Sequence, residues 1–510
     1  MSQLHLLPQF PQSYWTATAE IPEFPSLTSD HSADVVIVGG GMTGITAGYL
    51  LAQEGQKVIL LEAGRILNGT TGHTTAKITV QHGLIYDELI QHFGEDKARL
   101  YYEANRDALD FIRKIAESEK IACELAEESA YVYASSEQSA KKLETERTAY
   151  ERLGIPGELR ETADLPFAVT AALAVPNQSR FHPIPYLTTL INHMIEAGSE
   201  IYEHTTAKKV EEGERPVVVT GSGHRIDCRY VISASHFPFL NWKGLYFTRL
   251  HAERSYVLAV RVAQEYRGGM YISADTPTRS IRLANEGKDP LLLIGGDGHK
   301  AGESSCTFSH YEALQSFAES FFEVKEIAYR WSTQDLVTLD KVPYIGRINS
   351  NSDNILVATG YRKWGMTNST AAAHMLKNIV LGIDDPYLQA FDSSRFHSDP
   401  DIKSLITNNL DVAKNLISGK MEMVYRTPDE VGTNEGSVVR VNGKRAGAYR
   451  DPEGKLHLVD TTCTHMGCET HWNEADRTWD CPCHGSRFSY TGEVVEGPAK
   501  KPLKQVEMSE

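Results

Sequence analysis

The side chains best suited to chemistry lie in one short stretch near the C-terminus. Four of the seven cysteines fall there, together with His465 and His484. They form the pairs Cys463-x-His465 and Cys481-x-x-His484, with fifteen residues between the two pairs. Two thiolates suit one iron of a [2Fe–2S] cluster and two imidazoles suit the other, which gives a higher potential than an all-cysteine cluster. A structural zinc site is the alternative, because Zn²⁺ also binds mixed cysteine and histidine sets.

The full motifs around these pairs, C-T-H-x-G-C and C-P-C-H-G-S, favour the iron–sulfur interpretation. Both resemble the motifs of the Rieske family. The resemblance implies that Ser486 donates a hydrogen bond to a cluster sulfide and that Gly497-Pro498 covers the cluster. It implies four ligands and one disulfide: Cys463, His465, Cys481 and His484 bind iron, and Cys468 pairs with Cys483.

One position departs from the high-potential members of that family. Phe488 stands where they carry a tyrosine whose hydroxyl bonds a ligand sulfur. Without this donor the oxidised cluster is relatively more stable. We therefore expect a potential below the top of the family's range, which is about −150 to +300 mV.

A second motif lies near the N-terminus, where an apolar strand runs into a glycine turn and then a helix. Gly39 allows the tight turn, Gly41 lets a pyrophosphate approach the backbone, and Gly44 lets helix and strand pack closely. The phosphates would lie at the helix N-terminus. Glu62 ends the next strand, and its carboxylate is placed to accept hydrogen bonds from the ribose hydroxyls. The pattern predicts a dinucleotide-binding fold.

The loop after the second strand indicates which dinucleotide. It is rich in hydroxyls, and it resembles the loop that runs under the flavin in FAD-dependent oxidoreductases of the D-amino-acid-oxidase superfamily. The resemblance covers roughly residues 30–390 and is nearest to the glycine oxidase and γ-glutamylputrescine oxidase branch. It is specific for FAD but not for a substrate. It implies that the following residues contact FAD: Arg65, Thr70, Thr71, His73, Thr74, Val210, Gly360, Gly365 and Met366.

Three residues are candidates for catalysis. Arg282, on an expected strand, could pair with a substrate carboxylate, although an arginine is more often part of a surface ion pair. His73 and Lys77 follow the flavin loop and could face the flavin or activate oxygen. Hydrogen bonds to backbone or phosphate are at least as good an explanation for these two.

The remaining patterns predict the architecture. Residues 87–120 have helical periodicity, and 254–260, 270–273, 280–283 and 291–296 have strand character, with a hairpin turn at Gly296-Asp297-Gly298. We expect an α/β Rossmann-type FAD-binding domain interleaved with an α+β substrate domain, followed by a small all-β domain. The expected boundaries are an extended N-terminal arm over 1–30, an oxidoreductase domain over 31–390, a linker over 391–420 and a Rieske domain over 421–510. The apolar residues of the linker predict a helix that docks the last domain.

Composition limits the partners. The formal charge of −16 argues against nucleic acid and anionic membranes. No stretch approaches eighteen apolar residues, so no transmembrane segment is expected, and the N-terminus has no secretion signal. Cys123, Cys228 and Cys306 are expected to be buried, reduced thiols, which suits the cytoplasm.

Two redox centres in one chain predict an oxidoreductase. The preferred hypothesis is that a small substrate, an amine or amino acid, reduces FAD and that the cluster then passes electrons singly to an external acceptor, a carrier protein or a quinone. Two alternatives stay open. One is an oxidase that uses O₂ and carries a structural or regulatory Rieske domain. The other is a reductase that receives electrons through the cluster.

Overall fold

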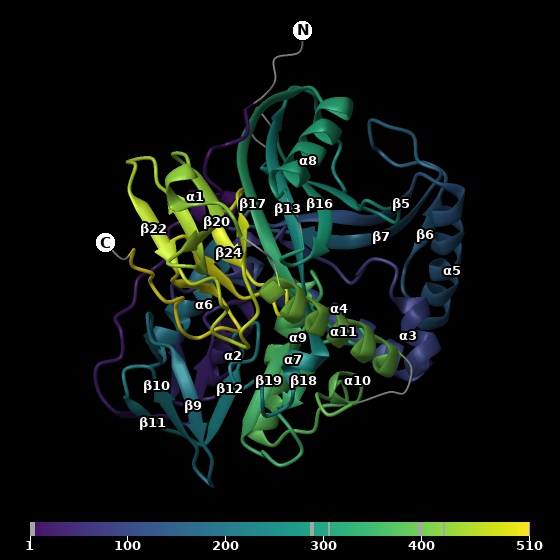
Figure 1. Ribbon diagram of the computed structural model, residues 1–510. Helices are drawn as coiled ribbons and strands as arrows, with labels where there is room; N and C mark the ends of the chain where they lie inside the picture. The colour runs from purple at the N-terminus through teal and green to yellow at the C-terminus, as the bar shows by residue number, and fades with distance from the viewer. Residues whose placement is uncertain (1–5, 286–289, 304–305, 396–399, 422–423, 509–510) are drawn as a thin grey trace.

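A computed structural model describes residues 6–285, 290–303, 306–395, 400–421 and 424–508 (Figure 1). The first five residues of the expected arm and residues 396–399 of the expected linker lie outside this range. Within it, three sheets with their helices form a large body, and a smaller domain built only of strands and short turns lies against it (Figure 1, yellow).

The cofactor sheet has six strands, and its centre consists of short, completely apolar segments. All residues of β2 (Val35–Val38) and β3 (Val58–Leu61) are buried, as expected for parallel strands covered on both faces. Helix α2 (Met42–Gln53) packs here against both α6 (Pro183–Glu196) and α9 (Gly365–Leu381). The strand order is β18 (Tyr344–Arg347), β19 (Ile355–Thr359), β12 (Tyr230–Ser233), β2, β3 and β8 (Glu200–Tyr202).

A small four-stranded sheet flanks this one. The strands are β1 (His31–Ser32), β11 (Arg225–Asp227), β10 (Val217–Thr220) and β9 (Ala207–Glu211). They share the apolar cluster that also buries Val36, Ile59 and Val231.

The large sheet supplies the opposite wall of the molecule. Its two longest strands, β13 (Leu250–Val262) and β17 (Val324–Thr338), are antiparallel neighbours. The other strands are β16 (Leu291–Lys300), β15 (Arg279–Asn285), β14 (Met270–Ser273), β5 (Ala126–Ala134), β7 (Ala171–Arg180), β4 (Lys77–Ile78) and β6 (Glu158–Arg160). The helices on this side are α3 (Tyr86–Phe93), α4 (Glu95–Ser118), α5 (Glu137–Leu153), α7 (Tyr246–Arg249) and α8 (Phe308–Phe321). The short helix α10 (Leu388–Phe391) contacts α4 and β18 of the cofactor sheet.

The four strands expected between residues 254 and 296 are present, but the hairpin turn expected at 296–298 is wrong. β16 continues through Gly296 to Lys300 and stays paired with β13. A register shift opposite Arg254–Tyr256 absorbs the irregular backbone, and Gly296 (φ +141°) adopts a conformation that glycine tolerates best.

The C-terminal domain contains two small antiparallel sheets. One has β20 (Glu435–Val441), β21 (Lys444–Arg450) and β22 (Leu456–Val459) after the single turn η2 (Pro428–Glu430). The other has β23 (His471–Asn473), β24 (Thr478–Asp480), β25 (Arg487–Ser489) and β26 (Val494–Glu496).

The predicted linker helix is confirmed as α11 (Asp401–Met421). The Asn409 side chain donates to the carbonyl of Thr248 in α7, at 3.1 Å. Val412 and Leu416 pack on the apolar core of the C-terminal domain. The helix therefore contacts both bodies.

Two expectations about the rest of the chain need correction. The N-terminal arm is not wholly extended, because residues 14–18 form helix α1 (Tyr14–Thr18), whose Trp15 is fully buried and donates to the Thr74 carbonyl. Cys123 and Cys228 are buried as expected, but Cys306 is exposed.

Candidate active site and metal centre

A single cavity of about 1810 Å³ lies between the cofactor sheet, the large sheet and the C-terminal domain. Its walls come from the turn after β2, from alternate residues of β13 and β17, and from residues 493–500. One continuous space therefore touches all three parts of the molecule.

The glycine turn adopts the geometry expected of a phosphate cradle. A Cβ on Gly39 (φ +118°) would lie 2.4 Å from the Ala234 carbonyl oxygen, and one on Gly44 would lie 2.0 Å from that of Gly39. Gly44 thus allows α2 to approach the strand, while Gly41 lines the cavity and caps α2. The start of α2 and its amides face the cavity, where an anion is favoured.

Glu62 closes the adjacent wall at the end of β3. Its carboxylate accepts from the backbone N–H groups of Gly40 and Gly64, each at 2.8 Å, and burial raises its pKa. Arg65 also lines the cavity, where it forms ion pairs with Glu23 (2.6 Å) and Glu203 (3.1 Å).

The hydroxyl-rich loop forms the short helix η1 (Thr70–His73) and is fixed from both sides. Thr70 donates to the Gln334 carbonyl on β17 (3.1 Å), and Thr71 accepts from the Met42 N–H on α2 (3.0 Å). Thr70, Thr71 and Thr74 line the cavity. His73 does not line it; its ring bonds the Gly69 carbonyl, and burial lowers its pKa.

The segment after β19 brings the N-terminus of α9 to the cavity. Gly365 and Met366 line it, together with Tyr361, whose hydroxyl is 2.8 Å from that of Thr43. Gly360 (φ +81°) lies behind this surface, with its Cβ position 2.3 Å from Thr338. Val210 also lies apart, buried in the core beside β10, and Thr206 and Ala207 line the cavity at this end.

The three catalytic candidates lie in different environments, and only Lys77 lines the cavity. Lys77 lines the cavity and donates to the Tyr271 carbonyl (3.1 Å); burial, followed by the charge of Arg282, lowers its pKa to about 7. Arg282 is buried outside the cavity lining, where it donates to the carbonyls of Thr75 and Leu283 and stacks over Trp15. His73 is turned toward its own loop, as described above.

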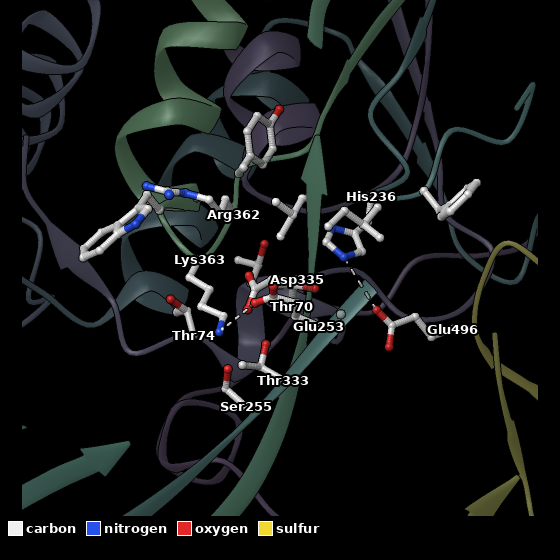
Figure 2. Close-up of a pocket in the computed structure, with 18 of the residues that line it drawn as sticks. Thr70, Thr74, His236, Glu253, Ser255, Thr333, Asp335, Arg362, Lys363 and Glu496 are labelled. Atoms are coloured by element: carbon white, nitrogen blue, oxygen red, sulfur yellow. Dashed lines mark ion pairs between the residues drawn. The ribbon is translucent and has the colours of Figure 1, made fainter. Parts of the chain in front are cut away.

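The most polar part of the cavity is formed by residues that no sequence motif singled out. Figure 2 shows Ser255, Glu253, Thr333 and Asp335 on the two long strands, with Lys363 and Arg362 above them. Lys363 forms an ion pair with Glu253 at 3.2 Å. His236 reaches toward Glu496 of the C-terminal domain, at 3.8 Å. These positions come from five separate segments, so no local spacing could have indicated them.

The four predicted iron ligands are brought together in the C-terminal domain. Cys463 and Cys481 are buried free thiols, and the hydrogen bond from Cys481 lowers the pKa of Cys463 to about 7. The ring centroids of His465 and His484 lie 4.9 Å apart. Burial lowers their pKa values to about 4 and about 3, so both rings are neutral at pH 7, the form that binds metal.

The remaining family features surround these ligands. Cys468 and Cys483 form the expected disulfide. Three sulfurs, those of Cys468, Cys481 and Cys483, lie within 4.8 Å of one another, but the disulfide leaves only Cys481 available as a ligand. The Ser486 hydroxyl bonds Cys463 and accepts from the Ala499 N–H, next to the cis Gly497–Pro498 bond. Phe488 is buried in the same core.

The cysteine and histidine centre faces the flavin-type body. The Asn241 side-chain amide lies 3.4 Å from Nε2 of His465, and Phe237 also contacts this imidazole. Phe247 contacts His484. Nδ1 of His465 is buried and has no hydrogen-bond partner within the described chain. The histidine edge of the centre is therefore covered by residues 237–247.

Buried charges hold the two bodies together. Arg254 on β13 is 1% exposed and lies 3.5 Å from Asp476 and 3.4 Å from Asp480. Gln334 donates to the Gly485 carbonyl (2.8 Å), and Arg330 donates to that of Ala475 (3.0 Å). Breaking one side of a buried ion pair leaves an uncompensated charge, so this interface is expected to be rigid.

Both sites fit the groups that the sequence implies. The glycine turn without Cβ atoms, the Glu62 carboxylate and the polar η1 loop provide the cradle that FAD requires. The two buried free thiols and two neutral imidazoles, one with an unpartnered Nδ1, provide the donor set of a Rieske [2Fe–2S] cluster rather than a four-cysteine site.

Comparison with known proteins agrees with this geometry. The FAD dependent oxidoreductase (DAO) family pattern matches residues 34–379, and the Rieske [2Fe-2S] domain pattern matches residues 422–507. The Rieske 2Fe-2S iron-sulfur protein YhfW of Bacillus subtilis (strain 168) is 49% identical over 508 residues, covering 100% of each chain.

More distant relatives match only part of the chain. The gamma-glutamylputrescine oxidoreductase of Escherichia coli (strain K12) is 26% identical, over 72% of this chain and 89% of that protein. The crystal structure of glycine oxidase from Geobacillus kaustophilus superposes with a TM-score of 0.61 at 20% identity, over 72% of this chain and 99% of that one, and this likeness shows the fold alone. The chain belongs to the DAO family of FAD-dependent oxidoreductases and carries a Rieske [2Fe–2S] domain at its C-terminal end.

Proposed function

We propose that this oxidoreductase oxidises a small amine or amino acid at FAD and sends the electrons singly through its Rieske cluster to an external acceptor. One observation carries the proposal. The cluster ligands His465 and His484 lie against residues 237–247, and the loop that precedes this segment, Ala234–His236, lines the FAD cavity. The cluster site and the cofactor site thus share one short stretch of chain.

When bound, FAD supplies a two-electron acceptor and the [2Fe–2S] cluster a one-electron carrier. The substrate would lose a C–H bond next to nitrogen, with the electron pair leaving as hydride and one proton leaving the nitrogen. Water then hydrolyses the resulting imine. The protein's own part is to orient the amine against the polar strand face and to keep the covered histidine edge of the cluster site dry.

The interface supports a fixed relay rather than a mobile domain. Arg254 and Gln334 contact Asp480 and Gly485, which immediately flank the second ligand pair, and Arg330 contacts Ala475 in the same domain. α11 covers the other side of the same loops through Val412, whose carbonyl is 3.8 Å from the Cys483 sulfur. Electron transfer over a fixed short distance needs no domain rearrangement.

The external partner would be a one-electron carrier protein or a quinone. No helix in the described parts of the chain has the length and apolar character needed to cross a membrane. We propose the cytoplasm as the compartment, where the three cysteines outside the cluster domain would stay reduced.

An anaerobic titration with a panel of amines and amino acids tests the proposal. Bleaching of the flavin together with the reduced-cluster EPR signal is expected for the true substrate. Flavin bleaching that only O₂ reverses, with the cluster remaining oxidised, would favour the oxidase alternative. Rapid flavin reduction by a reduced carrier protein, with no substrate reducing it, would favour the reductase alternative.

A further inference from the structure

Two carboxylates face each other on the strand wall of the cavity. Glu253 on β13 and Asp335 on β17 are direct partners in the antiparallel register, as are Ser255 and Thr333 next to them. All four line the cavity (Figure 2). Side chains at directly opposed positions have Cβ atoms about 4.5–5.5 Å apart, where like charges destabilise the sheet. Such a pair requires cations.

The described residues neutralise only one member of this pair. Against the effect of burial, a hydrogen bond from His251 and the charge of Lys363 lower the pKa of Glu253 to about 2. Asp335 is 8% exposed, and within the described chain its carboxylate forms no hydrogen bond or ion pair. Burial raises its pKa to about 6, although Lys363 and His236 act in the opposite direction.

The same wall offers little to a negatively charged group. Arg282, the residue expected from the sequence to bind a carboxylate, lies outside the cavity lining and is held by backbone carbonyls. Arg362 donates to the His82 carbonyl (2.9 Å), and Lys363 is paired with Glu253. A substrate carboxylate placed here would be repelled by Asp335.

We propose that Asp335 binds the ammonium group of the substrate, and that the substrate is a cationic amine with no carboxylate next to the amine carbon. The neighbouring hydroxyls of Ser255 and Thr333 accept its remaining N–H groups. This site rests on the proposed function and narrows its substrate class. A charge-assisted hydrogen bond in a buried site contributes about 1.5–3 kcal/mol, which corresponds to roughly 10- to 150-fold in affinity.

Binding is tested without turnover by tert-butylammonium, which has no C–H bond on its amine carbon and is not oxidised. The anion pivalate, which carries the same tert-butyl group, is the paired probe. Titration of the oxidised holoprotein with tert-butylammonium should perturb the flavin absorbance. The same perturbation by pivalate should require a concentration roughly tenfold higher or more. Asp335→Asn and Asp335→Ser should each weaken ammonium binding by a similar factor, while Asp353→Asn, at a side chain 85% exposed, should not. Retained flavin absorbance shows that a variant is folded.

The pH dependence gives a second readout. Protonation of Asp335 should weaken ammonium binding as pH falls through about 6, and the Asp335→Asn variant should lack this step. The other titratable groups facing Asp335 are Lys363, His236, Glu253 and Glu496. Because they remain in the variant, a step that persists there belongs to them and contradicts the proposal.

Different results would reject the proposed site and the proposed function. Ammonium binding that depends on Asp335, in a protein whose flavin no amine reduces, keeps the site and rejects amine oxidation. Flavin reduction by phenylglycine faster than by benzylamine, or equal reduction by wild type and Asp335→Asn, overturns the site while the oxidoreductase function stands. Tighter binding of pivalate than of tert-butylammonium also overturns it.

Discussion

At the scale of single residues, His484 joins the two halves of the molecule, because its ring lies next to His465 on one side and Phe247 on the other. We expect His484→Ala to abolish the Rieske EPR signal and to leave the FAD absorbance unchanged, since no FAD-cradle residue lies in this loop. The control is His457→Ala, in the same domain, whose side chain bonds Asp451 at 2.8 Å and lies outside the ligand set. A wild-type protein with one zinc and no iron would reject the cluster assignment.

At the scale of elements, Glu146 on α5 fixes the start of α3, which borders the cavity. Its carboxylate accepts from the N–H groups of Ile85, Tyr86 and Asp87 at 2.8–3.0 Å. Burial nevertheless raises its pKa from 4.5 to about 7. Between these values the folded protein holds a proton that the unfolded chain has lost, so the contribution of this group to the free energy of unfolding falls as pH rises, by up to about 3 kcal/mol.

Glu146→Gln should therefore flatten the pH dependence of Tm between pH 5 and pH 8. Differential scanning calorimetry at both pH values measures this, and Glu144→Gln, at an exposed position of the same helix, is the control. Parallel pH profiles for wild type and Glu146→Gln would show that the carboxyl is not buried as described.

The helix α11 is the second element with a testable role. Val412 and Leu416 pack on the cluster core, whereas Leu410 of the same helix is 64% exposed. Val412→Asp with Leu416→Asp should lift the helix and let solvent reach the disulfide loop, so that the cluster absorbance decays several-fold faster in the presence of an iron chelator. In the Leu410→Asp variant the cluster absorbance should decay at the wild-type rate. Equal decay in all three proteins would mean that α11 does not protect the cluster.

At the scale of the whole molecule, the sequence predicted what depends on contiguous residues. The glycine turn, the two ligand pairs and the linker helix follow from local spacing or periodicity, whereas the disulfide is implied by the resemblance to the Rieske family. Asp335 and Asn241 could not be found in this way. Asp335 acquires its role from its cross-strand partner Glu253, and Asn241 from docking against His465. Long-range pairing creates both environments, and a single sequence does not display it.

The docking of the Rieske domain is also a property of the whole molecule. It depends on Arg254, a buried cation between two aspartates of the other domain. Arg254→Met should loosen the interface, because two buried carboxylates then lack one of their cations. We expect increased proteolysis near residue 421 and retained FAD. Arg347→Met, at an exposed ion pair, is the control, and equal proteolysis rates would contradict the role of Arg254.

The central claim is that the cluster receives electrons from the flavin inside one molecule. A light pulse in the presence of deazaflavin reduces the protein-bound flavin without any substrate, and the cluster absorbance is then followed over time. We expect the cluster absorbance to bleach at a rate independent of protein concentration in wild type and His457→Ala, and we expect no such bleaching in His484→Ala. Cluster bleaching whose rate rises in proportion to protein concentration, or no cluster reduction while the flavin stays reduced, would contradict it.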